Sequence, residues 1–169
     1  MDQPVATGQV GEIVVRGPMV FCGYWRREED NKVTFRNGWH HTGDVGYRDD
    51  DGFFYIVDRK KDMIITGGFN VYCAEVEACV MELREVRECA VIGVPDEKWG
   101  EAVKAIVVLR DEESLKEEAI IAHCKARLGG VKSPKSVEFW QEIPRTPAAK
   151  IDKKAIRKTY WKAADRAVH

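Results

Sequence analysis

The chain has 169 residues, of which 44% are hydrophobic and 33% charged, and its 27 basic and 28 acidic side chains give a formal net charge of −1. This balance excludes a protein that coats nucleic acid, because one sign of charge would then dominate. No apolar run approaches the ~20 residues of a membrane-spanning helix, and the first residues are neither basic nor apolar, unlike a signal peptide.

Residues 1–57 are predicted to be β-rich. The β-branched run at 11–16 ends at Gly17-Pro18, which suits a strand closed by a turn. We expect a second strand at 20–25 and a helical turn or loop in the charged residues 26–31.

A hairpin is predicted around Asp49-Asp50-Asp51-Gly52, because Asp and Gly accept positive φ and the flanking residues 39–47 and 53–57 suit strands. The three aspartates could also suggest a calcium loop. They lack the alternating ligands and the distant glutamate that calcium binding needs, so we interpret them as a turn.

The compact charged block at 58–62 predicts a hinge at residues 58–61, followed by an α+β domain at 62–169. Ser114 is expected to begin a helix, with Glu117 completing a capping box, and the apolar stripe of that helix should face a core. The stripe comprises Ile120, Ile121, Cys124 and Leu128. The other elements predicted after the hinge are strands at 63–66, 89–94, 102–109 and 136–140 and helices at 74–83 and 152–163.

The five cysteines are odd in number and contain no C-x-x-C pair. We therefore expect reduced thiols in a cytoplasmic protein and no structural zinc site or other metal on this chain. They are Cys22, Cys73, Cys79, Cys89 and Cys124.

Basic residues concentrate at the C-terminal end, where ten basic and four acidic side chains follow from residue 132 onward. Two interpretations remain open: a solvated helix face, or a surface that meets phosphates.

Three clusters combine glycine freedom with charge. In the first, residues 38–44, the carboxylate of Asp44 could hold a vicinal diol such as a ribose, or could simply stabilise a turn. The adjacent His40 and His41 point to opposite faces of a strand, so we interpret them as structural.

In the second cluster, residues 58–70, Arg59 offers a planar fork of donors for phosphate or ribose oxygens. Gly67 and Gly68 either let backbone amides approach a ligand or make a turn. In the third, residues 144–150, two prolines stiffen a loop that presents Lys150, a compact cation suited to a phosphoryl or carboxylate oxygen.

Together these segments resemble the adenylate-forming acyl-CoA synthetases. The resemblance runs in family order through RGPMVFCGYW, GWHHTGD, DGFFYIVDRKKDMIITGGFNVY, AEVE, VIGVPDEKWGE and PRTPAAK. It is closest in character to fatty- and aryl-acid ligases, and it covers only the C-terminal third of a complete enzyme. It implies that residues 1–57 are the tail of a large N-terminal domain and that residues 62–169 are a small mobile lid, so we expect a truncated chain or a remnant reading frame.

The resemblance implies that ATP, as Mg-ATP, and a carboxylic acid give an acyl-adenylate, from which coenzyme A then takes the acyl group. Asp44 matches the aspartate that binds the ribose and Arg59 an arginine that touches the nucleotide. Lys150 matches the lysine that bridges the α-phosphate and the substrate carboxylate.

The lid is expected to pivot at Lys61 between the two half-reactions. Gly67, Gly68 and Asn70 would then line the pantetheine channel. Contacts to the CoA phosphates are expected from Lys125, Lys132 and Lys135.

Two positions depart from the family pattern. Ala149 stands where a glycine usually precedes the catalytic lysine, and a positive φ there would cost roughly 1–2 kcal/mol. Cys73 stands where proline is common, which removes some rigidity before the AEVE helix.

Alternatives of other classes remain: a non-catalytic interaction module, or one half of a split ligase complemented in trans. A fragment should not turn over alone. Unpaired sheet edges in residues 1–57 also predict a homodimer, strand exchange or disorder. The identity of the acid is not encoded in these residues.

Overall fold

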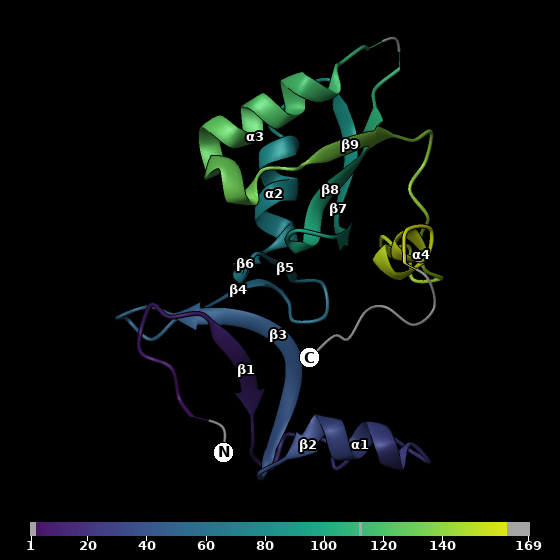
Figure 1. The fold of residues 1–169 in the computed structure, drawn as a ribbon. Helices are drawn as coiled ribbons and strands as arrows, with labels where there is room; N and C mark the ends of the chain where they lie inside the picture. Colours follow the sequence, from purple (N-terminus) through teal and green to yellow (C-terminus); the bar gives the residue numbers. More distant parts are fainter. Residues whose placement is uncertain (1–2, 112, 162–169) are drawn as a thin grey trace. The chain divides into compact units, whose positions relative to one another are not determined.

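The computed structural model describes residues 3–111 and 113–161. The chain divides into two compact units, Met1–Lys61 and Asp62–His169 (Figure 1). Among the described residues, no helix is long and apolar enough to cross a bilayer.

The first unit is built on a four-stranded antiparallel sheet in which the long strand β3 (Trp39–Arg48) pairs with the other three. The predicted hairpin is confirmed: the Asp49 carboxylate accepts a hydrogen bond from the Phe53 amide at 2.8 Å, and Gly52 takes φ 89°. The remaining elements are β1 (Gly11–Val15), α1 (Glu28–Thr34), β2 (Phe35–Arg36) and β4 (Phe54–Arg59).

The strand predicted at 20–25 is wrong, since the described residues there belong to turns and irregular backbone. The side chain of Asn31 satisfies the backbone of Tyr24 instead, accepting from its amide at 2.7 Å and donating to its carbonyl at 2.9 Å. Phe21 packs edge-on against Phe35 and His40. These local contacts take the place of a sheet ladder. The helical alternative for the next residues is the correct one, and α1 begins at Glu28.

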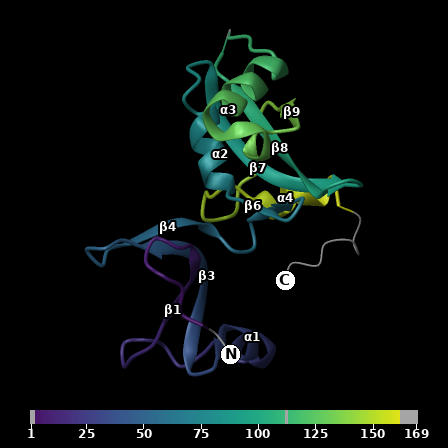
Figure 2. The same ribbon diagram turned by 60° about the vertical axis from the view of Figure 1, so that its left-hand side comes forward.

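The second unit is a five-stranded sheet with helices on its faces, which confirms the α+β class (Figure 2). Its central strand β8 pairs antiparallel with β7 and β5 and parallel with β9. The strands are β5 (Ile64–Thr66), β6 (Phe69–Val71), β7 (Val86–Asp96), β8 (Gly100–Leu109) and β9 (Ser136–Phe139), and the helices are α2 (Cys73–Val80), α3 (Glu117–Lys132) and α4 (Lys153–Lys158).

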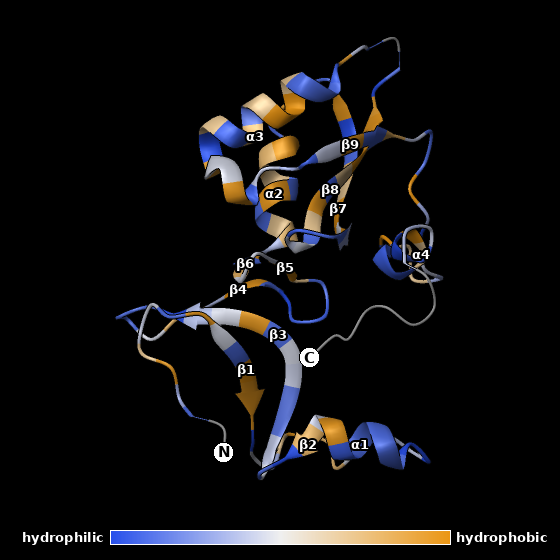
Figure 3. Cartoon of the chain, viewed as in Figure 1, coloured by the Kyte–Doolittle hydropathy of each residue, from blue (hydrophilic) through white to orange (hydrophobic). Residues whose placement is uncertain are grey.

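Both faces of the β7–β8 part of this sheet are buried. Because successive side chains of a strand point to opposite faces, Val103, Ala105 and Val107 of β8 join one core with α2 and α3, while Ile106 and Val108 join a second. The second core also contains Ile156 of α4. Apolar residues therefore dominate β7, β8 and α2 (Figure 3).

The capping box predicted at Ser114 is wrong, because α3 begins at Glu117 and its N-cap residue, Lys116, makes no side-chain capping bond in the described part of the chain. The Glu117 carboxylate accepts instead from the Val137 amide at 2.7 Å, which joins the helix to β9. The predicted stripe is confirmed: Ile120 and Cys124 are buried, and the other two residues pack against the same core.

The last helix is shorter than predicted. Asp152 caps α4 by accepting from the Ala155 amide at 2.9 Å, and the helix ends at Lys158. The final residue predicted for it, Ala163, lies outside the described residues. Two ion pairs brace α4: Arg157 with Asp62 at 2.8 Å and Lys153 with Glu77 at 2.7 Å.

The junction between the units also differs in detail from the prediction. Asp58 and Arg59, predicted as the start of the hinge, continue β4. Cys73, at the entry to α2, donates its thiol hydrogen to the Asp62 carbonyl at 2.9 Å. This hydrogen bond restrains the start of α2, where the resemblance implies a proline that would stiffen the backbone.

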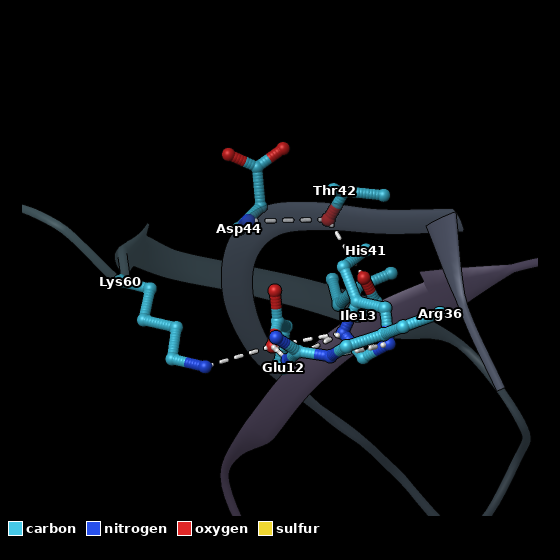
Figure 4. A network of polar contacts seen from close by, with 7 residues as sticks. All are labelled: Glu12, Ile13, Arg36, His41, Thr42, Asp44 and Lys60. Atoms are coloured by element: carbon cyan, nitrogen blue, oxygen red, sulfur yellow. Dashed lines mark hydrogen bonds and ion pairs between the residues drawn. The ribbon is translucent and has the colours of Figure 1, made fainter. Parts of the chain in front are cut away.

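A polar network centred on Glu12 lies beneath β3 in the first unit (Figure 4). The Glu12 carboxylate contacts Lys60 Nζ at 2.9 Å, His41 Nδ1 at 3.2 Å and Arg36 at 3.5 Å. Burial alone would raise the pKa of Glu12, but the hydrogen bonds from Lys60 and His41 outweigh it and lower the pKa below its ordinary value. The network thus ties β1 to β2, to β3 and to the end of β4.

Replacing this carboxylate should destabilise the first unit in a pH-dependent way. We expect Glu12→Gln to lose about 1.5–3 kcal/mol at neutral pH, because bonds to a charged group are lost. A lowered folded-state pKa stabilises above the unfolded-state pKa, and this stabilisation is lost as the pH falls through the folded-state pKa. The free energies of unfolding of the unmodified protein and of Glu12→Gln should therefore become equal in acid, as measured by amide hydrogen exchange in β1 and β3.

The matched control is Glu29→Gln, which removes an ion pair with Lys32 whose two side chains are 85% and 69% exposed. That change should cost at most about 0.5 kcal/mol. Equal effects of the two substitutions would contradict the bracing role of Glu12.

Candidate functional site

Asp44 and Arg59, the two residues expected to meet a nucleotide, are brought together by the sheet. They are cross-strand partners in β3 and β4, and Arg59 Nε lies 2.9 Å from Asp44 Oδ1. Arg59 remains half-exposed. In Figure 4 the Asp44 carboxylate points away from the Glu12 network. A carboxylate has several acceptor positions, so one paired with Arg59 keeps capacity for hydroxyl groups.

The direction of Asp44 follows from the residues just before it in β3. Thr42 donates its hydroxyl to the Ile13 carbonyl at 2.7 Å and accepts from the Asp44 amide at 3.1 Å. Gly43 takes φ 74°, and its carbonyl accepts from the Lys60 amide at 2.8 Å. The backbone around the carboxylate is thus held from β1 and from the end of β4.

The two adjacent histidines contact different partners, in line with the structural role predicted for them. His41 is buried and lies within hydrogen-bond distance of Glu12 and Arg36. The His40 ring packs at a tilt against Phe35 and edge-on against Phe21.

Gly67 and Gly68 form the turn between β5 and β6, with φ 55° and 83°. The Gly67 amide donates to the Trp99 carbonyl at 2.9 Å, and a Cβ on Gly67 would lie 2.6 Å from the Trp99 ring. A Cβ on Gly68 would meet nothing within 4 Å. The first glycine is therefore required by packing, whereas the second leaves its backbone accessible on an open face.

Two residues that the sequence analysis did not single out support this turn. Glu101 accepts from the Ile65 amide at 3.2 Å, and Trp99 carries Lys98 over its ring at 4.7 Å. Trp99 and Glu101 both belong to the motif VIGVPDEKWGE. Only the strand pairing shows that they support the turn between β5 and β6. Asn70, one residue beyond Phe69 in β6, is exposed and pairs with Ile65.

Lys150 is exposed at the end of a tight loop between β9 and α4. The Thr146 amide donates to the Lys150 carbonyl at 2.7 Å, the Lys150 amide donates to the Thr146 hydroxyl at 3.3 Å, and Arg145 forms a β-bridge with Ile151. Ala149 takes φ 58°, the positive value suspected from the sequence. The loop backbone is fixed while the lysine side chain extends into solvent.

Arg145 anchors this loop to the sheet. It donates to the Ala149 carbonyl at 2.9 Å and pairs with Glu88 of β7 at 2.9 Å. In the sequence, Arg145 is one of the ten basic residues counted from residue 132 onward and part of the motif PRTPAAK, with no role of its own. Its partner is 57 positions earlier in the chain, so no local pattern could have identified the pair.

Lys150 and the Gly67-Gly68 turn are held by different parts of the sheet, and no contact described for this unit joins them. The Lys150 loop depends on Glu88, and the glycine turn depends on Trp99. Lys61, the expected pivot, is exposed and is the last residue of the first unit.

The three lysines expected to contact CoA phosphates differ in their surroundings. Lys132 is engaged by both oxygens of Glu75, at 2.7 and 2.8 Å. Lys135 donates to the Gly130 carbonyl, and Lys125 is exposed on α3.

The chain is similar to known proteins over most of its length. Residues 75–150 match the family model of the AMP-binding enzyme C-terminal domain. The chain is 50% identical to a medium/long-chain-fatty-acid–CoA ligase of Mycobacterium tuberculosis over 98% of its own length and 30% of that protein, and 49% identical to a feruloyl-CoA synthase of an Amycolatopsis species over 94% of itself and 32% of the relative.

A similar solved structure is ATP-bound MatB from Rhodopseudomonas palustris, with a TM-score of 0.86 and 41% identity over 92% of this chain and 31% of that one. The chain thus spans about 30% of the length of the relatives it matches. The resemblance inferred from the motifs is confirmed: residues 75–150 match the AMP-binding enzyme C-terminal domain, and the chain is similar to the C-terminal part of fatty-acid–CoA ligases.

Proposed function

We propose that this chain supplies the C-terminal machinery of an enzyme that activates a carboxylic acid with ATP and transfers the acyl group to coenzyme A. The observation that carries the proposal is Lys150, an exposed cation on a loop whose backbone is fixed by Thr146 and Arg145. Such a preorganised cation can stabilise the charge that develops when a carboxylate attacks the α-phosphate.

Residues of the first unit bind the nucleotide. Asp44 accepts hydrogen bonds from the ribose hydroxyls, and Arg59 places its guanidinium beside the nucleotide while pairing with Asp44 at 2.9 Å. Magnesium enters with ATP as part of the substrate. None of these roles needs a metal ligand from this chain.

The turn between β5 and β6 receives the thiol-bearing arm of coenzyme A. Gly68 presents backbone without a side chain on an open face, which suits the approach of a pantetheine arm, with Gly67 and Asn70 beside it. The two half-reactions alternate by rotation at Lys61. Lys125 and Lys135 serve the CoA phosphates, and Lys132 contributes only if it leaves Glu75.

The acid is a fatty or aryl acid, a proposal supported by the names of the relatives, which include a fatty-acid–CoA ligase and a feruloyl-CoA synthase. We place the protein in the reducing cytoplasm. The support is chemical: all five cysteines lie in the described residues, and no disulfide joins them.

A second candidate function is docking, either as an interaction module, as half of a split ligase or as a homodimer. It is favoured by the apolar side chains around β4, where Phe53, Phe54 and Ile56 are all about two-thirds exposed. Pyrophosphate release separates these alternatives. An interaction module releases none in any assembly, whereas a split ligase releases it only when an N-terminal part is added.

The proposed function is tested by fusing this chain to the N-terminal part of a fatty-acid–CoA ligase relative. The fused enzyme should release pyrophosphate from ATP and fatty acid, and the chain alone should not. Lys150→Ala should lower adenylation by about 10²–10³-fold, because one preorganised charge is removed. Thioester formation from a preformed adenylate should change little. Equal loss in both half-reactions would contradict the role of Lys150.

The thiol-transfer role is tested by Gly68→Leu in the same fused enzyme. We expect adenylation to persist and thioester formation to stop, measured as acyl-CoA formed from preformed adenylate. Gly68→Ala is the matched control, because it introduces the same strain at φ 83° without the bulk. If alanine and leucine reduce the thiol step equally, backbone strain is responsible and the channel assignment fails.

Relief of strain at Ala149 should stabilise the Lys150 loop. At φ 58° an L-residue costs roughly 1–2 kcal/mol, of which glycine entropy offsets about 0.5–1 kcal/mol. Ala149→Gly should therefore stabilise the chain by up to about 1 kcal/mol in urea unfolding. Ala148→Gly is the control and should not stabilise. If neither change stabilises, Ala149 is not a strained position.

A further inference from the structure

Three side chains of metal-ligating types meet where α2 ends against α3. The Cys79 thiol, the Glu82 carboxylate and the His123 imidazole place their ligand atoms within 4.8 Å of one another. The two helices lie side by side in both views (Figures 1 and 2). A mixed sulfur, nitrogen and oxygen set of this kind is typical of zinc sites rather than of calcium or magnesium sites.

A second thiol lies behind this group of three. Cys124, the residue after His123, forms a thiol–thiol hydrogen bond with Cys79. Cys124 is fully buried and Cys79 nearly so. One thiol, an imidazole and a carboxylate supply three of the four ligands of a tetrahedral zinc site, which leaves the fourth position to a water molecule.

Hydrogen bonds now occupy the positions that a cation would take. His123 Nε2 lies 3.0 Å from Glu82 Oε2 and 3.1 Å from the Cys79 carbonyl. Arg127 also contacts Glu82, at 3.2 Å. His123 and Arg127 thus offer a proton or positive charge to the Glu82 carboxylate. A divalent ion could take their place and bind the carboxylate more strongly.

The cluster is reachable from solvent on one side only. Glu82 is 43% exposed and His123 21% exposed, while the two thiols face the core formed by α2, α3 and the sheet. An ion could therefore enter past the carboxylate and imidazole and reach the buried sulfur of Cys79.

We propose that Cys79, Glu82 and His123, with a water molecule as fourth ligand, bind one zinc(II) ion that joins the end of α2 to α3. Binding releases the proton of the Cys79 thiol to solvent, and the imidazole carries its remaining proton on Nδ1 while Nε2 ligates. No electron is transferred. Arg127 shifts from the ligating carboxylate oxygen to the other one.

This site is independent of the proposed catalytic function, because none of its ligands is assigned a role with ATP or CoA. The sequence analysis predicts no structural zinc site because it finds no C-x-x-C pair. Cys79 and Glu82 lie three positions apart and His123 follows more than 40 positions later, so no C-x-x-C spacing marks these ligands.

The test is titration of the full chain, carrying Cys22→Ser to remove the exposed thiol and kept under a reductant, with cobalt(II) and then zinc(II). We expect one cobalt per chain, with tetrahedral visible bands and an intense near-ultraviolet thiolate band, both lost on adding one equivalent of zinc. Zinc should also raise the melting temperature. A six-coordinate spectrum without the thiolate band would overturn the site.

Variants assign the ligands. His123→Asn and Glu82→Gln, both at partly exposed positions, should each weaken binding roughly tenfold or more, and Cys79→Ala should remove the thiolate band. The matched controls His40→Asn and Cys89→Ala should leave binding unchanged. If Cys79→Ala does not fold, the two partly exposed variants decide. Unchanged affinity in both would overturn the proposal.

Discussion

The antiparallel pairing of β7 with β8 is the constraint on which the second unit depends. It runs from Val86 opposite Leu109 to Asp96 opposite Gly100, and helices or connecting chain bury both of its faces. The two candidate functional loops are attached to these same two strands. Glu88 of β7 holds Arg145 and with it the Lys150 loop, while Gly100 of β8 pairs with Thr66 beside the glycine turn.

The charged residues of the chain divide into braces and exposed groups. Glu12, Asp62 and Glu77 are largely buried, and each accepts from a basic side chain. Such pairs are required once present, because removal of one partner leaves an uncompensated charge. Lys150 is different, since its backbone is held while its side chain is exposed. This exposure supports the role proposed for Lys150.

The same division resolves the two interpretations of the basic C-terminal segment. Lys132, Arg145, Lys153 and Arg157 each form an ion pair with an acidic residue of the second unit. The described part of the segment is therefore not one continuous phosphate-binding surface. Much of its positive charge fastens α3, α4 and the Lys150 loop to the rest of the unit, and Lys150 stands out because it is placed differently.

The sequence by itself determined the class of fold, the family and the hairpin at Asp49, because motif order, apolar alternation and turn residues are local properties. It also identified Ala149 as a departure from the family pattern, whereas the positive φ of this residue came from the structure. Local signals failed at residues 20–25 and at Ser114, where Asn31 and Val137 offered better hydrogen-bond partners from elsewhere in the chain. Only the tertiary structure decided the pairs Arg145–Glu88 and Asp44–Arg59 and the meeting of Cys79 with His123. Strand register and helix packing bring these residues together although they are distant in the sequence. No local sequence pattern predicts such contacts.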